Sequence, residues 1–142
     1  MKISASKVDL FVKAPPAELK VALIYGPDEG LVRERAATLG VSVVADLTDP
    51  FLVCDLTGGD ISSDPARLAD EVAAIALTGG RRLVRVRDAV DGISKAVQTI
   101  LDGAPGDALT ILQARQLGPR SALRKLAESA DDAAAIPCYS DD

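Results

Sequence analysis

Short apolar runs alternate regularly with longer segments whose apolar residues recur at helical spacing, and this alternation limits the fold more than any other feature. Five apolar runs predict strands over 21–25, 51–56, 83–87, 108–112 and 134–136. The intervening patterns predict helices over 6–12, from residue 31 onward, from 65 to the Gly79-Gly80 pair, over 93–101 and over 119–130. Strands that alternate with helices build βαβ units. Runs that are apolar on both faces suit parallel strands. The sequence therefore predicts an α/β three-layer sandwich around a mostly parallel five-stranded sheet.

The length of 142 residues fits one domain, with residues 1–20 as a helix and lead-in and residues 21–142 as the α/β unit. Because hydrophobic residues make up 48% of the chain and aromatic residues only 3%, we expect an aliphatic core. Cys54 and Cys138 each lie in an apolar run and are expected to be reduced core residues. With no signal-peptide pattern and no apolar stretch of membrane-spanning length, the expected location is the cytoplasm.

Charge and composition narrow the function. A net charge of −5 argues against a free-standing nucleic-acid binder. The chain has no His, which removes the commonest general base and a common metal ligand, and leaves no Ser-His triad. The aspartate pairs at 46/49 and 131/132 are interpreted as solvated turns. We therefore predict no catalytic residue, no metal site and no cofactor.

The turn after the first predicted strand is the segment to examine for phosphate binding. In P-loop proteins the backbone N–H groups of a glycine-rich loop hold phosphates, a Lys reaches the terminal phosphates, and a Ser or Thr holds magnesium. Here the loop reads Gly26-Pro27-Asp28-Glu29-Gly30, one residue short of that spacing and with no Lys, Ser or Thr after it. The fourth predicted strand also ends without a carboxylate for magnesium. The sequence favours a degenerate phosphate loop in which Asp28 or Glu29 caps the next helix, with a nucleotide-binding P-loop enzyme as the alternative.

Arginines surround the third predicted strand and form a candidate basic contact patch: Arg81, Arg82, Arg85 and Arg87. Arg85 and Arg87 share one face because side chains alternate along a strand. Such a face suits acidic neighbours or phosphate, whereas the ordinary interpretation is a solvated or salt-bridged edge. A second candidate patch on the last predicted helix has the same two interpretations: Arg120, Arg124 and Lys125. A direct DNA-binding module is thus a further hypothesis, and it predicts DNA affinity that falls steeply with salt.

Six stretches follow one another through most of the chain: LIYGPDEGLVRER at 23–35, DPF at 49–51, DPARLADE at 64–71, GGRRLVRV at 79–86, RSALRKL at 120–126 and IPCY at 136–139. In order and spacing they resemble the N-terminal domain of the delta subunit of the bacterial DNA polymerase III clamp loader, most closely its alphaproteobacterial versions. The resemblance implies a RecA-like AAA+ fold with a decayed phosphate loop. Delta subunits are usually more than twice as long, so it also implies that their C-terminal helical domains are absent from these residues.

The resemblance implies a noncatalytic component of the DNA polymerase III holoenzyme that binds and opens the beta sliding clamp during DNA replication, while other subunits hydrolyse ATP. The implied partners are the clamp and the other loader subunits, gamma/tau and delta prime. DNA is reached through the complex, and no membrane is involved.

The family contacts the clamp at the end of the helix before the third strand, where an apolar pair, typically Leu-Phe, enters a pocket on the clamp. By that correspondence the clamp-binding residues are Leu77 and Thr78, preceded by Ile75 and Ala76. Thr78 departs from the pattern, and burial of the missing aromatic side chain would contribute about 1.5–3 kcal/mol. Weaker clamp affinity is therefore expected. The alternative for Leu77 is an ordinary core residue that ends its helix.

Overall fold

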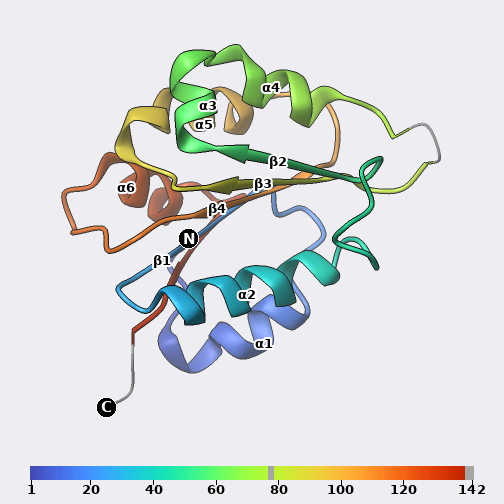
Figure 1. The fold of residues 1–142 in the computed structure, drawn as a ribbon. Helices are drawn as coiled ribbons and strands as arrows, with labels where there is room; N and C mark the ends of the chain where they lie inside the picture. The colour runs from blue at the N-terminus through green and yellow to red at the C-terminus, as the bar shows by residue number, and fades with distance from the viewer. Residues whose placement is uncertain (77–78, 140–142) are drawn as a thin grey trace.

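The computed structural model describes residues 1–76 and 79–139, in which a sheet lies between two layers of helices (Figure 1). The strands are β1 Val21–Tyr25, β2 Val53–Thr57, β3 Leu83–Arg87, β4 Leu109–Gln113 and β5 Ala133–Pro137. They form one five-stranded sheet in the order β2-β3-β4-β1-β5, and every pairing is parallel. The predicted three-layer α/β sandwich with five strands is confirmed.

The helices divide unequally between the two faces of the sheet (Figure 1). One layer holds α1 Val8–Lys13 and α2 Glu29–Val41, and the other holds α3 Gly58–Ser63, α4 Ala66–Ala73, α5 Ser94–Leu101 and α6 Ala122–Ser129. Short 3₁₀ turns, η1 Ala5–Lys7 and η2 Asp91–Ile93, precede α1 and α5. None of the helices in the described part of the chain has both the length and the apolar character that crossing a lipid bilayer would need.

The core lies on both sides of β1, which is paired with β4 on one side and β5 on the other. Val21, Leu23 and Tyr25 pack in the cluster beneath α3 to α6. Ala22 and Ile24 pack in the second cluster, against α1 and α2. All five are at most 1% exposed, because a parallel strand covered by helices on both faces has no side turned to water.

The start of β2 differs from the prediction, which placed residues 51 and 52 in the strand. They form a turn instead, because Asp49 satisfies their backbone amides. Its side chain accepts a hydrogen bond from the amide of Phe51 at 2.9 Å, and its carbonyl accepts one from Leu52 at 3.3 Å. Short aspartate side chains compete with the sheet for backbone donors in this way. Phe51 is left 61% exposed.

A short helix, α3, begins at Gly58, between the predicted strand over 51–56 and the helix predicted from 65. The cause is a reciprocal cap: the Thr57 hydroxyl accepts from the Asp60 amide at 3.1 Å, and the Asp60 carboxylate accepts from the Thr57 amide at 2.9 Å. Gly58 is required because a Cβ there would lie 2.2 Å from the carbonyl oxygen of Asp88.

Helix α4 ends at Ala73, several residues before the predicted end at Gly79-Gly80. The guanidinium of Arg82 donates to the Glu71 carbonyl, which satisfies one of the free acceptors at the end of the helix. Ala74 is extended. At the other end, the residue before the helix is Pro65, and no side chain caps it.

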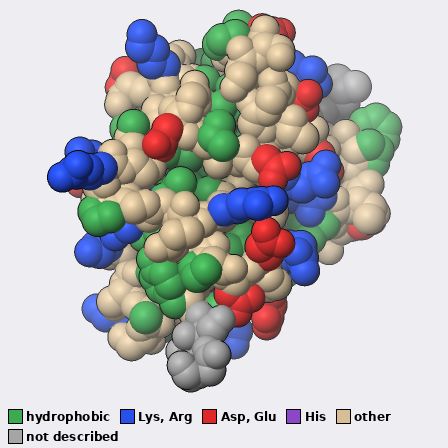
Figure 2. Space-filling model, turned by 60° about the vertical axis from the view of Figure 1, so that its left-hand side comes forward, with side chains coloured by type: hydrophobic (Ala, Val, Ile, Leu, Met, Phe, Trp, Pro, Cys, Tyr) green, Lys and Arg blue, Asp and Glu red, His purple; other side chains and the backbone are tan. Residues whose placement is uncertain are grey.

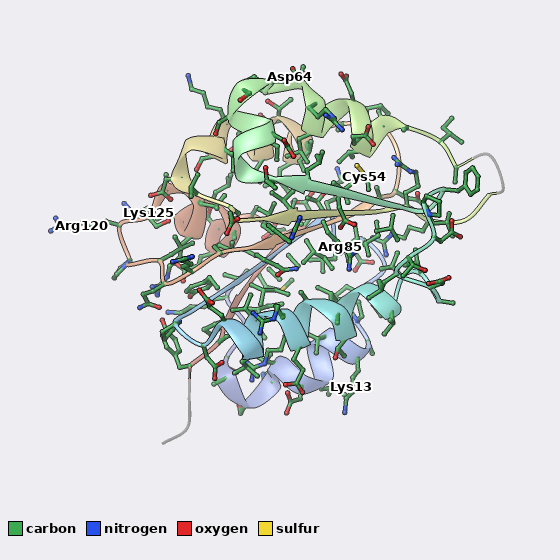
Figure 3. The ribbon with its side chains drawn as sticks, in the orientation of Figure 1. Lys13, Cys54, Asp64, Arg85, Arg120 and Lys125 are labelled. Atoms are coloured by element: carbon green, nitrogen blue, oxygen red, sulfur yellow. The ribbon has the colours of Figure 1, made fainter. Side chains whose placement is uncertain are left out.

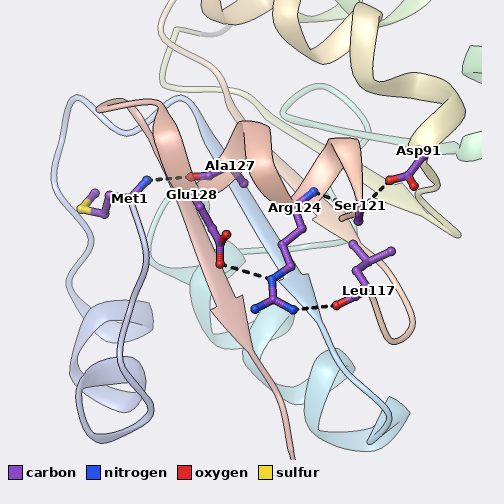
Figure 4. Close-up of polar contacts among 7 residues, drawn as sticks. All are labelled: Met1, Asp91, Leu117, Ser121, Arg124, Ala127 and Glu128. Carbon is purple, nitrogen blue, oxygen red and sulfur yellow. Dashed lines mark hydrogen bonds and ion pairs between the residues drawn. The ribbon is translucent and has the colours of Figure 1, made fainter. Parts of the chain in front are cut away.

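Both ends of α6 are held by groups from other segments (Figure 4). At its start, the Asp91 carboxylate accepts from the Ser121 hydroxyl at 2.5 Å and from the Leu123 amide at 3.1 Å. The amino group of Met1 donates to three carbonyls at and beyond the other end of the helix, those of Ala127 at 2.6 Å, Ala130 at 2.9 Å and Ala133 at 2.6 Å. A positive charge is favourable at a helix C-terminus. These contacts fix α6 beside β5.

We expect Asp91→Ala to lower the free energy of unfolding by about 1–3 kcal/mol, because two donors lose their acceptor. The thermal midpoint should fall by several degrees. Asp107→Ala is the control, since the exposed Asp107 side chain makes no hydrogen bond or ion pair with the described residues.

The pH dependence of this difference has a definite sign. The Ser121 hydroxyl first, and then the Leu123 amide, lower the pKa of Asp91 below its ordinary value of 3.8. The stabilisation is therefore complete above that value and is lost as the pH falls through the lowered pKa. Denaturant melts of the parent and Asp91→Ala should differ at pH 7 and converge in strong acid. A constant difference across this range would contradict the role given to the carboxylate.

Candidate functional site

Three backbone amides at the turn between β1 and α2 and in the first residues of α2 donate to protein oxygens. Oδ1 of Asp28 accepts a hydrogen bond from the Leu31 amide at 3.0 Å, which confirms the predicted cap. The Gly26 amide donates to the Arg115 carbonyl at 3.2 Å, and the Val32 amide donates to the Asp28 carbonyl at 3.0 Å. A phosphate loop needs such N–H groups directed at the ligand. These three are directed at protein oxygens.

The chain that follows β5 lies against the first glycine of this loop. Gly26 has a φ of 148°, and a Cβ there would lie 2.1 Å from the carbonyl oxygen of Cys138. The Cys138 amide donates to the Tyr25 carbonyl at 2.7 Å. The guanidinium of Arg35, on α2, donates to the Pro137 carbonyl at 2.8 Å. Burial raises the pKa of the Cys138 thiol. The loop is thus packed by the protein's own chain.

A polar cavity of about 220 Å³ lies beside this loop, at the carboxyl ends of β3 and β4. Its polar lining residues come from α2, from the end of β3 and from the end of β4: Glu29, Arg33, Arg87, Asp88, Gln113 and Arg115. Open parallel sheets bind ligands at this edge. Basic and acidic side chains stand among apolar ones over the face that includes this edge (Figure 2).

Sequence reasoning missed one carboxylate in this cavity, that of Asp88, because it searched only the end of the fourth strand. Asp88 follows β3 directly, at a positive φ of 54°, and lines the cavity together with Glu29. Glu29 forms an ion pair with Arg115 at 3.6 Å, with both side chains exposed. Within residues 1–76 and 79–139, no group of three or more potential metal ligands occurs.

The four arginines around β3 do not share one environment. Arg81 donates to the carbonyls of Asp107 at 2.5 Å and Leu19 at 2.7 Å. Arg85 donates to both carboxylate oxygens of Asp55, at 2.7 and 3.0 Å. With Arg82 bound to Glu71, three of the four guanidinium groups are engaged within the protein. The fourth belongs to Arg87, which is exposed and lines the cavity.

The ion pair between Arg82 and Glu71 lies beside Cys54. Arg82 lies 3.4 Å from the Glu71 carboxylate, which also accepts a hydrogen bond from the Cys54 thiol. Burial, followed by the contact with Glu71, raises the pKa of Cys54 to about 12. This thiol therefore stays protonated at neutral pH.

The second predicted patch divides in a similar way. Arg124 lies over the ring of Tyr25, 5.3 Å from its centroid, and donates to the Glu128 carboxylate at 3.2 Å and the Leu117 carbonyl at 2.9 Å (Figure 4). Arg120 and Lys125 are exposed and project away from the body of the molecule (Figure 3).

The predicted clamp-binding residues lie between α4 and β3, and the structure describes two of the four. Leu77 and Thr78 lie outside the described residues. Ile75 is 88% exposed, whereas Ala76 is 8% exposed and packs inward.

A second exposed apolar residue belongs to the turn that runs beside this segment. The Leu83 amide donates to the Leu52 carbonyl at 2.7 Å, and Gly80 approaches the Leu52 side chain. Phe51, next to Leu52, is exposed on the same turn. We refer to Phe51 and Ile75 together as the apolar tip.

Comparison with known proteins finds a likeness in structure alone, since no protein-family model and no curated protein matches the sequence. The DNA clamp loader delta protein of Bacillus subtilis matches with a TM-score of 0.72 and 17% sequence identity over 95% of this chain and 42% of its own. A DNA polymerase III gamma subunit-related protein of Thermotoga maritima matches with a TM-score of 0.64 and 17% identity over 94% of this chain and 46% of its own. The chain spans less than half the length of either neighbour. At this identity the likeness shows a shared fold.

Two glycine substitutions in the loop between β1 and α2 should change the free energy of unfolding in opposite directions. Gly26→Ala should destabilise the fold by more than about 1 kcal/mol, because a Cβ meets backbone and the φ is unfavourable for other residues. Gly30→Ala should stabilise it by up to about 1 kcal/mol, because Gly30 is helical and its Cβ would meet only the Asp28 side chain, at 3.6 Å. Chemical denaturation of the two variants measures both signs. Equal effects would contradict this description of the loop.

We expect Mg-ATP to raise the thermal midpoint no further than magnesium-free tripolyphosphate does at the same ionic strength. The loop offers no Lys, Ser or Thr for phosphate and magnesium, and the amides of Gly26, Leu31 and Val32 are engaged. A ligand that binds the native state raises its midpoint. An additional rise that requires both adenosine and magnesium would support the P-loop enzyme alternative.

Proposed function

We propose that this chain is a noncatalytic domain of a bacterial DNA polymerase III clamp loader, of the delta type, which binds and opens the beta sliding clamp during DNA replication. The observation that carries the proposal is Ile75, which stands 88% exposed on the segment between α4 and β3. This is the segment at which the delta family is expected to contact the clamp. The fold shared with the delta protein of Bacillus subtilis supports the same assignment.

The apolar tip has the chemistry of a docking contact. The backbone of Ala74, the residue before Ile75, is extended. The Ile75 side chain therefore projects into solvent and does not lie along a helix. Burying an exposed isoleucine against a partner contributes about 1.5–3 kcal/mol. Phe51 offers an aromatic side chain from the neighbouring turn, and we propose that it takes part in place of the aromatic residue missing at Thr78.

Clamp opening needs no catalytic residue in this domain. A protein that binds the open form of a ring more tightly than the closed form shifts the population toward the open form. The shift is limited by the difference in affinity for the two forms. The loop between β1 and α2 has no Lys, Ser or Thr of the P-loop type, and this is consistent with a domain that leaves ATP hydrolysis to other loader subunits. Those subunits, of the gamma/tau and delta prime types, are the further partners that we propose.

We expect Ile75→Asp to weaken binding to the sliding clamp encoded by the same genome by about tenfold to a hundredfold, because a charge replaces a buried apolar contact. Leu10→Asp is the matched control, since Leu10 is 75% exposed on α1, far along the chain from the tip. Thermal midpoints of both variants should stay within a few degrees of the parent, as is usual for exposed positions. Co-elution on a sizing column and a titration of the clamp provide the measurement.

Leu77→Asp tests the residue that the family resemblance assigns to the contact. We expect it to abolish co-elution with the clamp. If Ile75→Asp and Leu77→Asp both bind the clamp as tightly as the parent, the docking surface lies elsewhere. If the parent itself shows no affinity for the clamp, the proposed function is wrong.

A further inference from the structure

Two adjoining cavities form one groove on the α2 side of the sheet. The cavity of about 220 Å³ at the carboxyl ends of β3 and β4 shares three lining residues with a second cavity of about 410 Å³. The shared residues are Arg33, Arg87 and Gln113. The second cavity continues past Arg85 and Asp55, at the middle of β3 and β2. We call the two together the arginine groove.

The arginine groove exists because one face of β2 and β3 is apolar at the amino ends of the strands and polar further along them. Val53 and Leu83, at the amino ends of these strands, are buried in the cluster beneath α1 and α2. Two positions further along the same face stand Asp55 and Arg85. Arg85 lies on the side of the sheet that faces α2 (Figure 3). The carboxyl halves of both strands therefore present polar groups toward the helix.

Part of the charge in the groove is already compensated. Arg85 is held by both oxygens of Asp55, which occupies its donors in a bidentate pair. Among the residues that the structure describes, the Arg115 side chain pairs only with the Glu29 carboxylate, at 3.6 Å, and it remains 82% exposed. Such an exposed and distant pair contributes little to stability, so Arg115 can turn toward another anion.

Arg33 and Arg87 lack even that compensation. In the described part of the chain, neither guanidinium makes a hydrogen bond or an ion pair. Each of these two side chains lines both cavities. Arg33 belongs to α2, and Arg87 is the last residue of β3. The nearby carboxylate of Asp88 opposes an anion, but Arg33, Arg87 and the Gln113 amide supply donors from three separate elements.

We propose that the arginine groove binds a phosphate group. A carboxylate has two oxygens and is satisfied by one guanidinium, whereas a phosphate offers more acceptors to several guanidinium groups and an amide. The cavity between Arg33, Arg87 and Arg115 is smaller than the roughly 300–1,000 Å³ of pockets for whole small molecules. This part of the groove therefore suits a phosphate group. Its place at the carboxyl ends of parallel strands is where such sheets bind ligands.

The groove does not depend on the proposed clamp contact. It lies at the carboxyl ends of the strands, whereas the apolar tip lies before the amino ends of β2 and β3. Substitutions in the groove leave Phe51 and Ile75 in place. Failure of one proposal therefore leaves the other standing.

The test compares thermal midpoints in sodium pyrophosphate and in sodium chloride at equal ionic strength. It also measures the affinity for a single-stranded oligonucleotide by fluorescence anisotropy. The variants are Arg33→Gln and Arg87→Gln, both at exposed positions. The control is Arg120→Gln, which removes the same charge from an exposed arginine that projects away from the molecule (Figure 3). Each variant is compared with its own midpoint in chloride, so a change in stability is not mistaken for a change in binding.

We expect the parent and Arg120→Gln to bind at least one probe with equal affinity, and each groove variant to bind it about tenfold more weakly or worse. A rise of the thermal midpoint in pyrophosphate would show that the groove binds free phosphate groups. A response to the oligonucleotide alone would identify the nucleic-acid backbone, with an affinity that falls with salt. The proposal is overturned if the parent responds to neither probe, or if all variants respond alike.

Discussion

Burial of β1 on both faces and along both edges is the constraint on which the rest of the structure depends. Its five side chains are at most 1% exposed, and its backbone pairs with β4 and β5. A parallel strand in this position must be apolar throughout, and its ends are fixed by the two neighbouring registers. The loop that leaves β1 therefore emerges at one defined place, between the ends of β4 and β5, and the cavity at that edge follows from it.

At that edge, groups of the protein itself hold the turn between β1 and α2. Asp28 accepts the amide that opens α2, and Gly26 is covered by the chain around Cys138. A carboxylate of the chain thus occupies the favourable end of the helix dipole.

The sequence predicted the fold well where a pattern depends on nearby residues. Strands β1 and β3 were placed to the residue because their apolar runs are continuous, and the Asp28 cap follows from local chemistry. Errors arose where a distant group decides the outcome. Arg82 reaches back from β3 to end α4, and this leaves Ile75 in water. The arginine groove was not foreseen because Arg33, Arg87 and Arg115 come from three elements that only the sheet order brings together.

The two native thiols have a practical consequence for spectroscopy. Cys138 is fully buried, and the pKa of Cys54 stands at about 12 beside Glu71. Maleimides and iodoacetamides react with thiolates, so both cysteines should react slowly at neutral pH. A single Ile75→Cys substitution would then accept a fluorophore or spin label selectively, without removal of the native cysteines. Distance changes between such a probe and a labelled partner would report domain movement in an assembled complex.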